Sequence, residues 1–363
     1  MKILYVTSKG SIHDYRFLKN LVNDYTVMLL HYAADRLIPE IENLPGIEII
    51  SKKPVFRAFP LLSELSHFKK IVKSFKPDVV HTGYVWQVGT IAAYAGVHPH
   101  LSMPWGSDVL IEPGKKLFAK RLASKVFRTC DHVQCDAEFV KAKIMNDYGV
   151  SGDKITVFPW GIDLELFKPM EKTCLRQKSN IPNDKFVVIF NRNLEEVYGI
   201  HCMLNAFMEF QKDKNDVLLL IVSDGSQTND VTGFIAKNKL EDKVRLVGKI
   251  PNIDMSALLN CSDVYLSTSL SDGTSLSLLE ALACGTGIVV TDVPAIKEWV
   301  TGENGIVVQR NNSHQTALAL EKYYYSRELI KQHGDKNILI AKKRADWNKN
   351  YLKLKEIYSK LCE

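Results

Sequence analysis

Short apolar runs alternate with longer segments of helical periodicity along nearly the whole chain. In the first half, the apolar runs predict strands at residues 2–7, 26–31, 46–51, 78–81 and 100–103. Between them, apolar residues at helical spacing predict helices, the clearest at residues 15–23, 65–76 and 83–96. Strands that alternate with helices in this way indicate a parallel sheet with helices on both faces.

A second series of the same kind follows a break at residues 159–169, which holds two prolines. Its predicted strands are residues 186–190, 217–222, 244–247, 264–267 and 288–291. The chain is therefore predicted to be an α/β protein of two Rossmann-like, doubly wound domains, residues 1–165 and 170–340. A final helix is expected at about residues 341–363. Ligands of such sheets bind at the carboxyl ends of the strands, so we expect the ligand in a cleft between facing domains.

The most informative segment is residues 267–285, in which a polar loop leads into an apolar helix. The first turn of such a helix leaves backbone N–H groups free, and the helix dipole favours an anion there. Two acids, Asp272 and Glu280, can accept hydrogen bonds from hydroxyl groups. Glu280 lies among apolar residues, which favours a ligand hydroxyl as its partner over simple exposure. Phosphate and polyol together indicate a nucleotide sugar.

Five loops at predicted strand ends contain glycine or a concentration of polar groups. They are residues 9–14, 81–84, 104–108, 192–198 and 271–275. Arg192 is a candidate diphosphate ligand because guanidinium binds phosphate oxygens in pairs, and a surface arginine is the alternative. His13 and His81 each follow a strand of the first half, although a lone histidine is more often structural than catalytic.

Composition narrows the function without deciding it. The 363 residues are 46% hydrophobic and 24% charged, as in ordinary globular proteins. The net charge of +6 fits an anionic small molecule or loose attraction to an anionic membrane, and it is too diffuse to indicate nucleic acid. Lysines among residues 69–76 predict a solvated helix face, with lipid docking as the alternative.

Seven scattered cysteines lack the paired spacing of a metal site and indicate thiols in a reducing cytoplasm. We find neither a signal peptide nor an apolar stretch of membrane-spanning length. The expected location is the cytoplasm, with peripheral contact at the inner face of the membrane as a further possibility.

The chain resembles, almost end to end, the retaining GT-B glycosyltransferases of the family 4-like, group 1 type. That family carries two acids separated by seven residues, matched here by Asp272 and Glu280. Further matches are Pro-Asp-Val-Val-His at residues 77–81, Pro-Trp-Gly-Ile-Asp at 159–163, Val-Arg-Leu-Val-Gly at 244–248, and Glu298 with Gly302 and Gly305. The resemblance implies a C-terminal helix that crosses back to the first domain. It also implies a nucleotide-sugar donor and no bound metal or other cofactor.

The resemblance also implies a role for each matching residue. Glu280 would bind the ribose of the donor, and Asp272 would bind its sugar hydroxyls. Arg192 would hold the diphosphate together with Ser275 and the amides of the helix start, Leu276 and Ser277. The remaining donor contacts would come from Lys249 and Ile250 beside the base and from Gly10 and His13 near the phosphates.

Three positions depart from the family pattern. The first acid is usually glutamate, so Asp272 is one methylene shorter. Tyr198 stands where a lysine usually assists the diphosphate arginine. Trp105 stands where a first-domain histidine often lies near the reacting sugar, and it could stack on a sugar face while Asp108 accepts a hydroxyl. The catalytic candidates are therefore Arg192, Asp272, Asp108 and Trp105.

The expected reaction is retaining transfer of a sugar from a UDP- or GDP-linked donor to an acceptor hydroxyl, in cell-surface glycan or glycolipid biosynthesis. Because no enzymic nucleophile is evident, we expect front-side attack with electrostatic stabilisation of the leaving diphosphate. Two alternatives stay open. One is a nucleotide-sugar epimerase of GT-B fold, and the other is a non-catalytic nucleotide-binding scaffold subunit, suggested by Trp105 and Tyr198.

Overall fold

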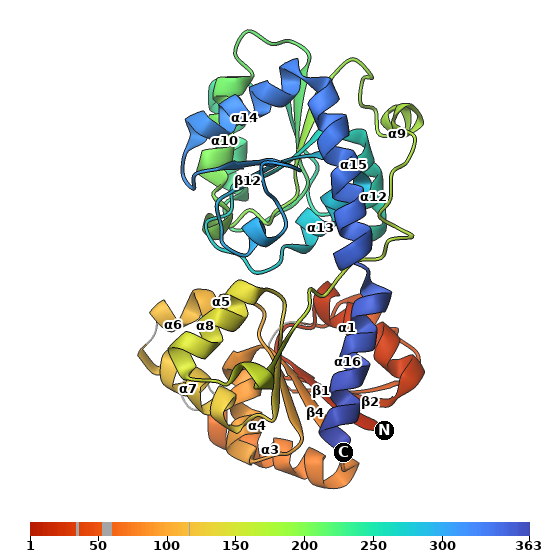
Figure 1. Ribbon diagram of the computed structural model, residues 1–363, viewed down its shortest axis with the longest axis vertical. Helices are drawn as coiled ribbons and strands as arrows, with labels where there is room; N and C mark the ends of the chain where they lie inside the picture. Colours follow the sequence, from red (N-terminus) through yellow and green to blue (C-terminus); the bar gives the residue numbers. More distant parts are fainter. Residues whose placement is uncertain (34–35, 53–59, 116) are drawn as a thin grey trace. The chain divides into compact units, whose positions relative to one another are not determined.

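The computed structural model describes residues 1–33, 36–52, 60–115 and 117–363, and Figure 1 shows their course. The chain forms two compact units. The first unit comprises residues 1–158 together with 352–363, and the second comprises residues 159–351. The last helix therefore ends in the first unit, as expected for a C-terminal helix that crosses back.

The first unit is built on a seven-stranded sheet of order β3-β2-β1-β4-β5-β6-β7, with every pairing parallel. The strands are β1 (Lys2–Thr7), β2 (Thr26–His31), β3 (Ile47–Ser51), β4 (Val79–Gly83), β5 (His100–Met103), β6 (His132–Cys135) and β7 (Ile155–Val157). Central strand β1 aligns Ile3 with Val27 on one side and Val79 on the other, and Ile3 through Val6 are fully buried. Helices on both faces require such continuously apolar strands.

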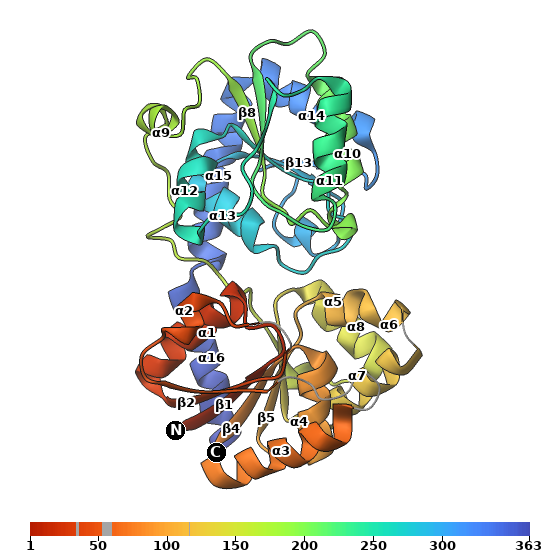
Figure 2. The same cartoon turned by 180° about the vertical axis from the view of Figure 1, so that it is seen from behind.

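Helices cover the two faces of this sheet (Figures 1 and 2). They are α1 (Ile12–Asp24), α2 (Pro39–Glu42), α3 (Pro60–Phe75), η1 (Val85–Gly89), α4 (Thr90–Ala95), α5 (Ser107–Leu110), α6 (Glu112–Lys115), α7 (Leu117–Thr129), α8 (Glu138–Tyr148), η2 (Gly152–Lys154) and α16 (Trp347–Cys362). Leu4 and Val6 pack in one core cluster with Phe68 of α3 and Ile91 of α4. On the opposite face, the ring of Tyr5 meets His81, which in turn contacts Tyr358 of α16.

The second unit is built on a six-stranded parallel sheet of order β10-β9-β8-β11-β12-β13. Its strands are β8 (Phe186–Phe190), β9 (Val217–Ile221), β10 (Val244–Leu246), β11 (Val264–Ser267), β12 (Gly287–Thr291) and β13 (Ile306–Val308). Its helices are α9 (Lys172–Lys178), η3 (Glu196–Tyr198), α10 (Ile200–Phe210), α11 (Thr228–Asn238), α12 (Asn252–Cys261), α13 (Leu276–Cys284), η4 (Ile296–Glu298), α14 (Ser313–Tyr325) and α15 (Arg327–Arg344). The core lies between the sheet and helices such as α10 and α14, where Phe207 and Tyr323 are buried.

The structure confirms the predicted fold class, and each predicted strand is present. Strands β6, β7 and β13, of three or four residues each, were not predicted from the sequence. The helix predicted over residues 83–96 is wrong at its start. Tyr84 and Gln87 have φ values of 89° and 58°, so the regular helix begins only at Thr90.

The helix predicted near residues 341–363 is present as α16, but it starts later than predicted, because α15 ends at Arg344 and α16 begins at Trp347. Ile162 enters this break, donating its amide to the Ala345 carbonyl at 2.8 Å and accepting the Trp347 amide at 3.0 Å. The neighbouring Gly161 has φ +80°, and a Cβ there would lie 2.9 Å from the Trp347 backbone. The Pro-Trp-Gly-Ile-Asp motif therefore has a local structural reason for its glycine.

Candidate functional site

In the second unit, the strand order reverses between β8 and β11. Successive strands run outward in opposite directions from this pair, so the loops at their carboxyl ends diverge and leave a crevice where ligands bind in open α/β sheets. The loop after β8 carries Arg192, and the loop after β11 carries Asp272 and leads into α13. The sequence thus places its strongest candidates at the switch point of this sheet.

Arg192 connects these two loops through its guanidinium group. One terminal nitrogen donates to the hydroxyls of Ser275 and Ser277, the latter at 2.8 Å, and the other donates to the Asp272 carboxylate at 2.6 Å. The guanidinium also lies 4.3 Å from the centre of the Tyr198 ring. With an exposed fraction of 9%, the side chain is held in one position rather than extended into solvent.

The start of α13 is organised by hydroxyl groups. Ser275 is the N-cap, and its side chain accepts the amide of Leu278. The Ser277 hydroxyl lies 2.9 Å from that of Tyr265 in β11. The structure therefore brings Arg192 together with Ser275 and Ser277 at a helix N-terminus, where an anion is favoured. Tyr265 was missed by sequence reasoning because it lies inside an apolar strand.

Asp272 and Arg192 form a largely buried ion pair. Burial raises the pKa of the Asp272 carboxyl above its usual range, while the charge of Arg192 and a backbone hydrogen bond oppose this rise. Burial alone disfavours the charged guanidinium, but Asp272 and the nearby tyrosines raise the pKa of Arg192 above its ordinary value. Asp272 was predicted to contact sugar hydroxyls; in this structure it is the counter-ion of Arg192.

The other predicted donor residues of the second unit lie on two different elements. Glu280 is on α13 with an exposed fraction of 5%, between the buried Leu279 and Ala281, as its apolar neighbours predicted. Lys249 and Ile250 follow edge strand β10, with Lys249 exposed. Within the described ranges, no hydrogen bond joins these two residues to the Arg192 cluster, so their place beside a base stays a prediction.

The first unit has its own switch point, between β1 and β4, and aromatic side chains gather there. The Trp105 ring meets His13 edge-on at 5.5 Å and Tyr84 at 6.4 Å between centroids. The Lys9 ammonium lies 5.3 Å from the centre of the Tyr84 ring. The structure thus brings together His13 and Trp105, which were separate candidates from the sequence, with Lys9 and Tyr84, which were not singled out.

The carboxylate of Asp108 fixes the backbone of two loops in this cluster. Its side chain is fully buried, and its two carboxylate oxygens accept the backbone amides of Val85 at 2.8 Å and Trp105 at 2.9 Å. Burial raises the pKa of Asp108 to about 6, although the amide hydrogen bonds lower it. No part of the carboxylate reaches the surface, so in this structure Asp108 positions the backbone of Val85 and Trp105, and its direct contact with a hydroxyl stays a prediction.

Gly10 and His81 also have structural reasons for their identities. Gly10 has φ +60°, and a Cβ there would lie 2.3 Å from a methyl carbon of Leu37. His81 is fully buried, its Nδ1 lies 2.6 Å from the Tyr358 hydroxyl, and burial lowers its pKa to about 3. His81 is thus a neutral core residue, and the structural interpretation of this histidine is confirmed.

Two family profiles match the chain, one in each unit. Residues 2–137 match "Glycosyl transferase 4-like", and residues 171–334 match "Glycosyl transferases group 1". The chain belongs to the group 1 glycosyltransferases of GT-B fold. This glycosyltransferase has no helix, within its described ranges, that is long and apolar enough to cross a bilayer.

Curated relatives of the glycosyltransferase share about a quarter of its residues. An uncharacterized glycosyltransferase of Methanocaldococcus jannaschii is 24% identical over 67% of this chain, and the match spans 62% of that protein. A D-inositol 3-phosphate glycosyltransferase of Pseudarthrobacter chlorophenolicus is 23% identical over 78% of this chain and 68% of its own. The alpha-monoglucosyldiacylglycerol synthase of Acholeplasma laidlawii is 24% identical over 90% of this chain and 83% of its own.

Solved structures confirm the GT-B fold of the glycosyltransferase. Anabaena HepE, crystallised in complex with UDP, superposes with a TM-score of 0.84 at 18% identity, covering 99% of this chain and all of that one. Sucrose-phosphate synthase from Thermosynechococcus elongatus gives the same TM-score at 17% identity, with 99% of both chains covered. At these identities the likeness establishes the fold alone.

Proposed function

We propose that this glycosyltransferase uses a nucleotide-diphosphate sugar, UDP- or GDP-linked, and transfers the sugar to an acceptor hydroxyl. The observation that carries this proposal is the position of Arg192, which is fixed by Ser275, Ser277 and Asp272 at the start of α13. A guanidinium beside a helix N-terminus at a sheet's switch point suits a diphosphate. The structures of Anabaena HepE with UDP and with UDP-glucose support the choice of donor class.

In this proposal, each second-unit residue has one task. Arg192 and the amides of Leu276 and Ser277 bind the diphosphate. The buried carboxylate of Glu280, on the helix that begins at Ser275, accepts ribose hydroxyls. Asp272 orients the donor sugar, which requires it to exchange part of its contact with Arg192 for sugar hydroxyls.

Transfer would proceed with retention of configuration by front-side attack. The acceptor hydroxyl approaches from the side on which the diphosphate departs. The bond between the sugar's anomeric carbon and the diphosphate oxygen breaks, a bond to the acceptor oxygen forms, and the leaving phosphate takes the acceptor proton. Negative charge then grows on the diphosphate next to Arg192 and the α13 amides, which stabilise it without moving. No metal is required in this scheme, because the guanidinium and the helix terminus supply the positive field.

The acceptor is proposed to be a lipid-linked or cell-surface glycan, handled on the cytoplasmic side of the membrane. The support is the similarity to the alpha-monoglucosyldiacylglycerol synthases of Acholeplasma laidlawii and Streptococcus pneumoniae and to inositol phosphate glycosyltransferases. The aromatic cluster around Trp105 suits this role in the first unit, since an aromatic face can pack against a sugar ring.

The test begins with a thermal-shift screen of UDP, GDP and ADP and of their sugars, since a ligand that binds the folded state raises the melting temperature. The stabilising sugar donor is then incubated with candidate acceptors, and the anomeric configuration of the product is determined by NMR. Arg192→Ala should remove the shift and lower kcat/KM for transfer about 10³-fold. The matched control is Arg245→Ala, an arginine of β10 that donates to the carbonyls of Ser179 and Asn180. Stabilisation by none of the nucleotides would overturn the proposal, as would consumption of the donor to an epimer without an acceptor.

A further inference from the structure

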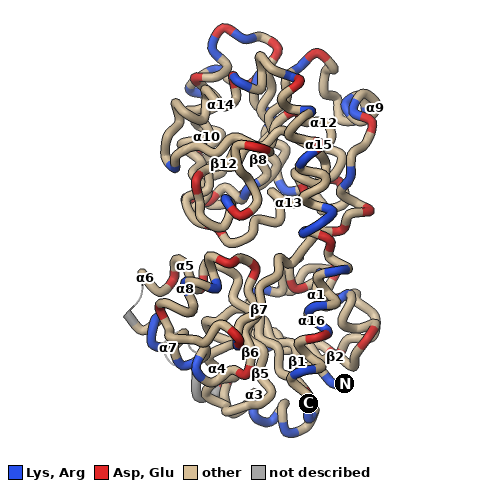
Figure 3. Tube along the Cα trace, viewed as in Figure 1, with Lys and Arg blue, Asp and Glu red and all other residues tan. Residues whose placement is uncertain are grey.

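One layer of helices in the first unit carries an unusual concentration of positive charge. Helices α3, α4 and α7 are neighbours covering one side of the first sheet (Figures 1 and 2). Their exposed charged side chains are all cationic: Lys69, Lys70, Lys73, Lys120, Arg121, Lys125 and Arg128. The seven positive charges of these side chains exceed the net charge of the whole chain, which is +6. In Figure 3, α3 and α7 carry blue segments, which mark lysine and arginine. We call this set the basic face.

The basic face has almost no neutralising acids of its own. The acid on its helices, Glu64, has an exposed fraction of 4%. Across the described part of the chain, none of the seven cations forms an ion pair, although Lys125 lies 5.9 Å from the Tyr94 ring centre. By contrast, Arg176 and Lys214 of the second unit pair with Asp263 and Glu321. Unpaired like charges repel one another, so the basic face favours a partner of opposite charge.

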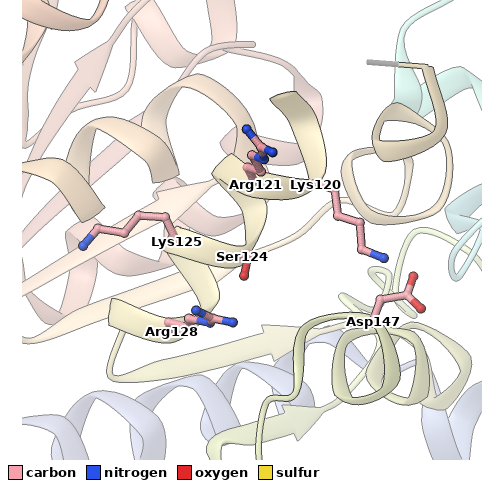
Figure 4. A pocket seen from close by; sticks show the side chains of 6 residues that line it. All are labelled: Lys120, Arg121, Ser124, Lys125, Arg128 and Asp147. Carbon is pink, nitrogen blue, oxygen red and sulfur yellow. The ribbon is translucent and has the colours of Figure 1, made fainter. Parts of the chain in front are cut away.

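The side of α7 nearest α8 has a hollow suited to a phosphate group (Figure 4). Lys120, Ser124 and Arg128 follow one another at intervals of four residues and therefore lie on the same side of the helix. Lys120 extends toward Asp147 of α8 in Figure 4, and Asp147 is already paired with Lys143 at 2.6 Å. Two cations and a hydroxyl are thus available to an anionic oxygen group.

Large aromatic side chains are exposed among these cations. Phe118 on α7 has an exposed fraction of 74%, and Tyr94 on α4 has 44%. Lysine and arginine with exposed aromatic rings are the composition of protein surfaces that lie in the headgroup region of a bilayer. The charges spread over neighbouring helices rather than along one groove, which favours an extended surface over a single polymer strand.

We propose that the basic face is a docking surface for a bilayer that contains anionic phospholipid. Phosphate headgroups bind the lysines and arginines of α3 and α7, and Phe118 inserts at the level of the headgroups. The surface belongs to the first unit alone and does not depend on the identity of the donor. Docking there would hold the enzyme next to lipid-linked substrates.

Vesicle flotation tests this proposal with the full-length protein. Vesicles of phosphatidylcholine with 30% phosphatidylglycerol should bind the wild type, and vesicles of phosphatidylcholine alone should not. Each cation near an anionic surface contributes about fivefold in partitioning, so Lys120→Gln, Arg121→Gln and Arg128→Gln together should lower it roughly a hundredfold. Raising the salt to about 0.5 M should have a similar effect because it screens the charges. Phe118→Ser alone should lower partitioning by roughly tenfold.

The matched control removes the same charge elsewhere. Lys331, Lys342 and Lys343 are exposed cations of α15 in the second unit, and their triple glutamine variant should partition within about twofold of the wild type. The nucleotide-induced thermal shift should be the same in the α7 triple variant as in the wild type. An unchanged shift would show that the variant is correctly folded. Equal binding of the wild type to both kinds of vesicle would overturn the proposal. So would equal losses in the two triple variants, or binding to an RNA oligonucleotide without binding to anionic vesicles.

Discussion

The two sheets have comparable switch points, but the loops above them are held by different chemistry. In the second unit, the charged pair Arg192–Asp272 joins the loops after β8 and β11. In the first unit, a carboxylate also joins two loops, but Asp108 accepts backbone amides from Val85 and Trp105 and is wholly buried. Asp272 thus pairs with a cation of a potential ligand site, whereas Asp108 is buried and supports the backbone of its loops.

Because of this difference, the two loop clusters present different chemical groups to a ligand. The Arg192 cluster presents a fixed positive charge and hydroxyl groups, which suit a diphosphate. The Trp105 cluster presents aromatic edges together with His13 and the cation of Lys9. Its acid, Asp108, accepts hydrogen bonds from backbone amides. The loop cluster around Arg192 is therefore suited to electrostatic binding, and the loop cluster around Trp105 to shaping a less charged contact.

The largest effect is expected from Arg192→Ala, which breaks the second unit's charged cluster. Loss of one fixed donor to a developing negative charge costs about 10² to 10³ in rate, and here Asp272 is also left buried without its cation. We expect kcat/KM for transfer to fall about 10³-fold. Steady-state assays with the stabilising donor measure this. Arg192→Lys should recover part of the activity, and a loss below threefold in Arg192→Ala would show that the cluster does not bind the leaving group.

The next effect tests the structural acid of the first unit. Asp108→Ala removes two hydrogen bonds to buried amides, each worth about 1.5 kcal/mol when the acceptor is charged. We expect the free energy of unfolding to fall by about 3 kcal/mol, measured by chemical denaturation. The nucleotide-induced thermal shift should persist, because Arg192 and Glu280, the residues proposed to bind the diphosphate and the ribose, lie in the second unit. An unchanged unfolding free energy would contradict the positioning role.

The pH dependence of stability separates Asp108 from an ordinary surface acid. Its pKa is about 6 in the folded protein, against about 4 for an unfolded aspartate. The folded state therefore holds its proton more tightly, and this contribution to stability is lost as the pH rises from about 4 to 6. Relative to Asp108→Asn, the wild type should lose on the order of 2 kcal/mol over that interval. Parallel stability curves for the two proteins would rule out the raised pKa.

The sequence predicted the framework of the molecule better than its site contacts. Apolar runs such as residues 186–190 identify strands because parallel strands buried on both faces must be continuously apolar. Glycine-rich and polar loops then mark the carboxyl ends. The burial of Glu280 followed from its apolar neighbours in the same helix, which is local information.

What the sequence could not provide was contact between distant segments. Nothing near residue 272 indicates that Asp272 pairs with Arg192, eighty positions earlier, rather than pointing to solvent. Nothing near residue 108 indicates that both oxygens of Asp108 accept buried amides. The break before Trp347 likewise depends on Ile162, which is distant in the chain. Such pairings follow from topology, so they emerge only when the sheets are assembled.

The smallest expected effect concerns the polar groups beneath the first unit's loops. Tyr358→Phe removes the hydroxyl that lies 2.6 Å from His81 and leaves a buried ring nitrogen without that partner. We expect α16 to lose about 1 to 2 kcal/mol of local stability. Hydrogen exchange of the α16 amides measures this directly. The control is Tyr325→Phe, because the Tyr325 side chain is 75% exposed and its hydroxyl can be replaced by water contacts. Donor binding should not change in either variant. A loss of nucleotide affinity in Tyr358→Phe would mean that the first unit's buried network acts on ligand binding, and the contrast between the Arg192 loop cluster and the Trp105 loop cluster would then have to be abandoned.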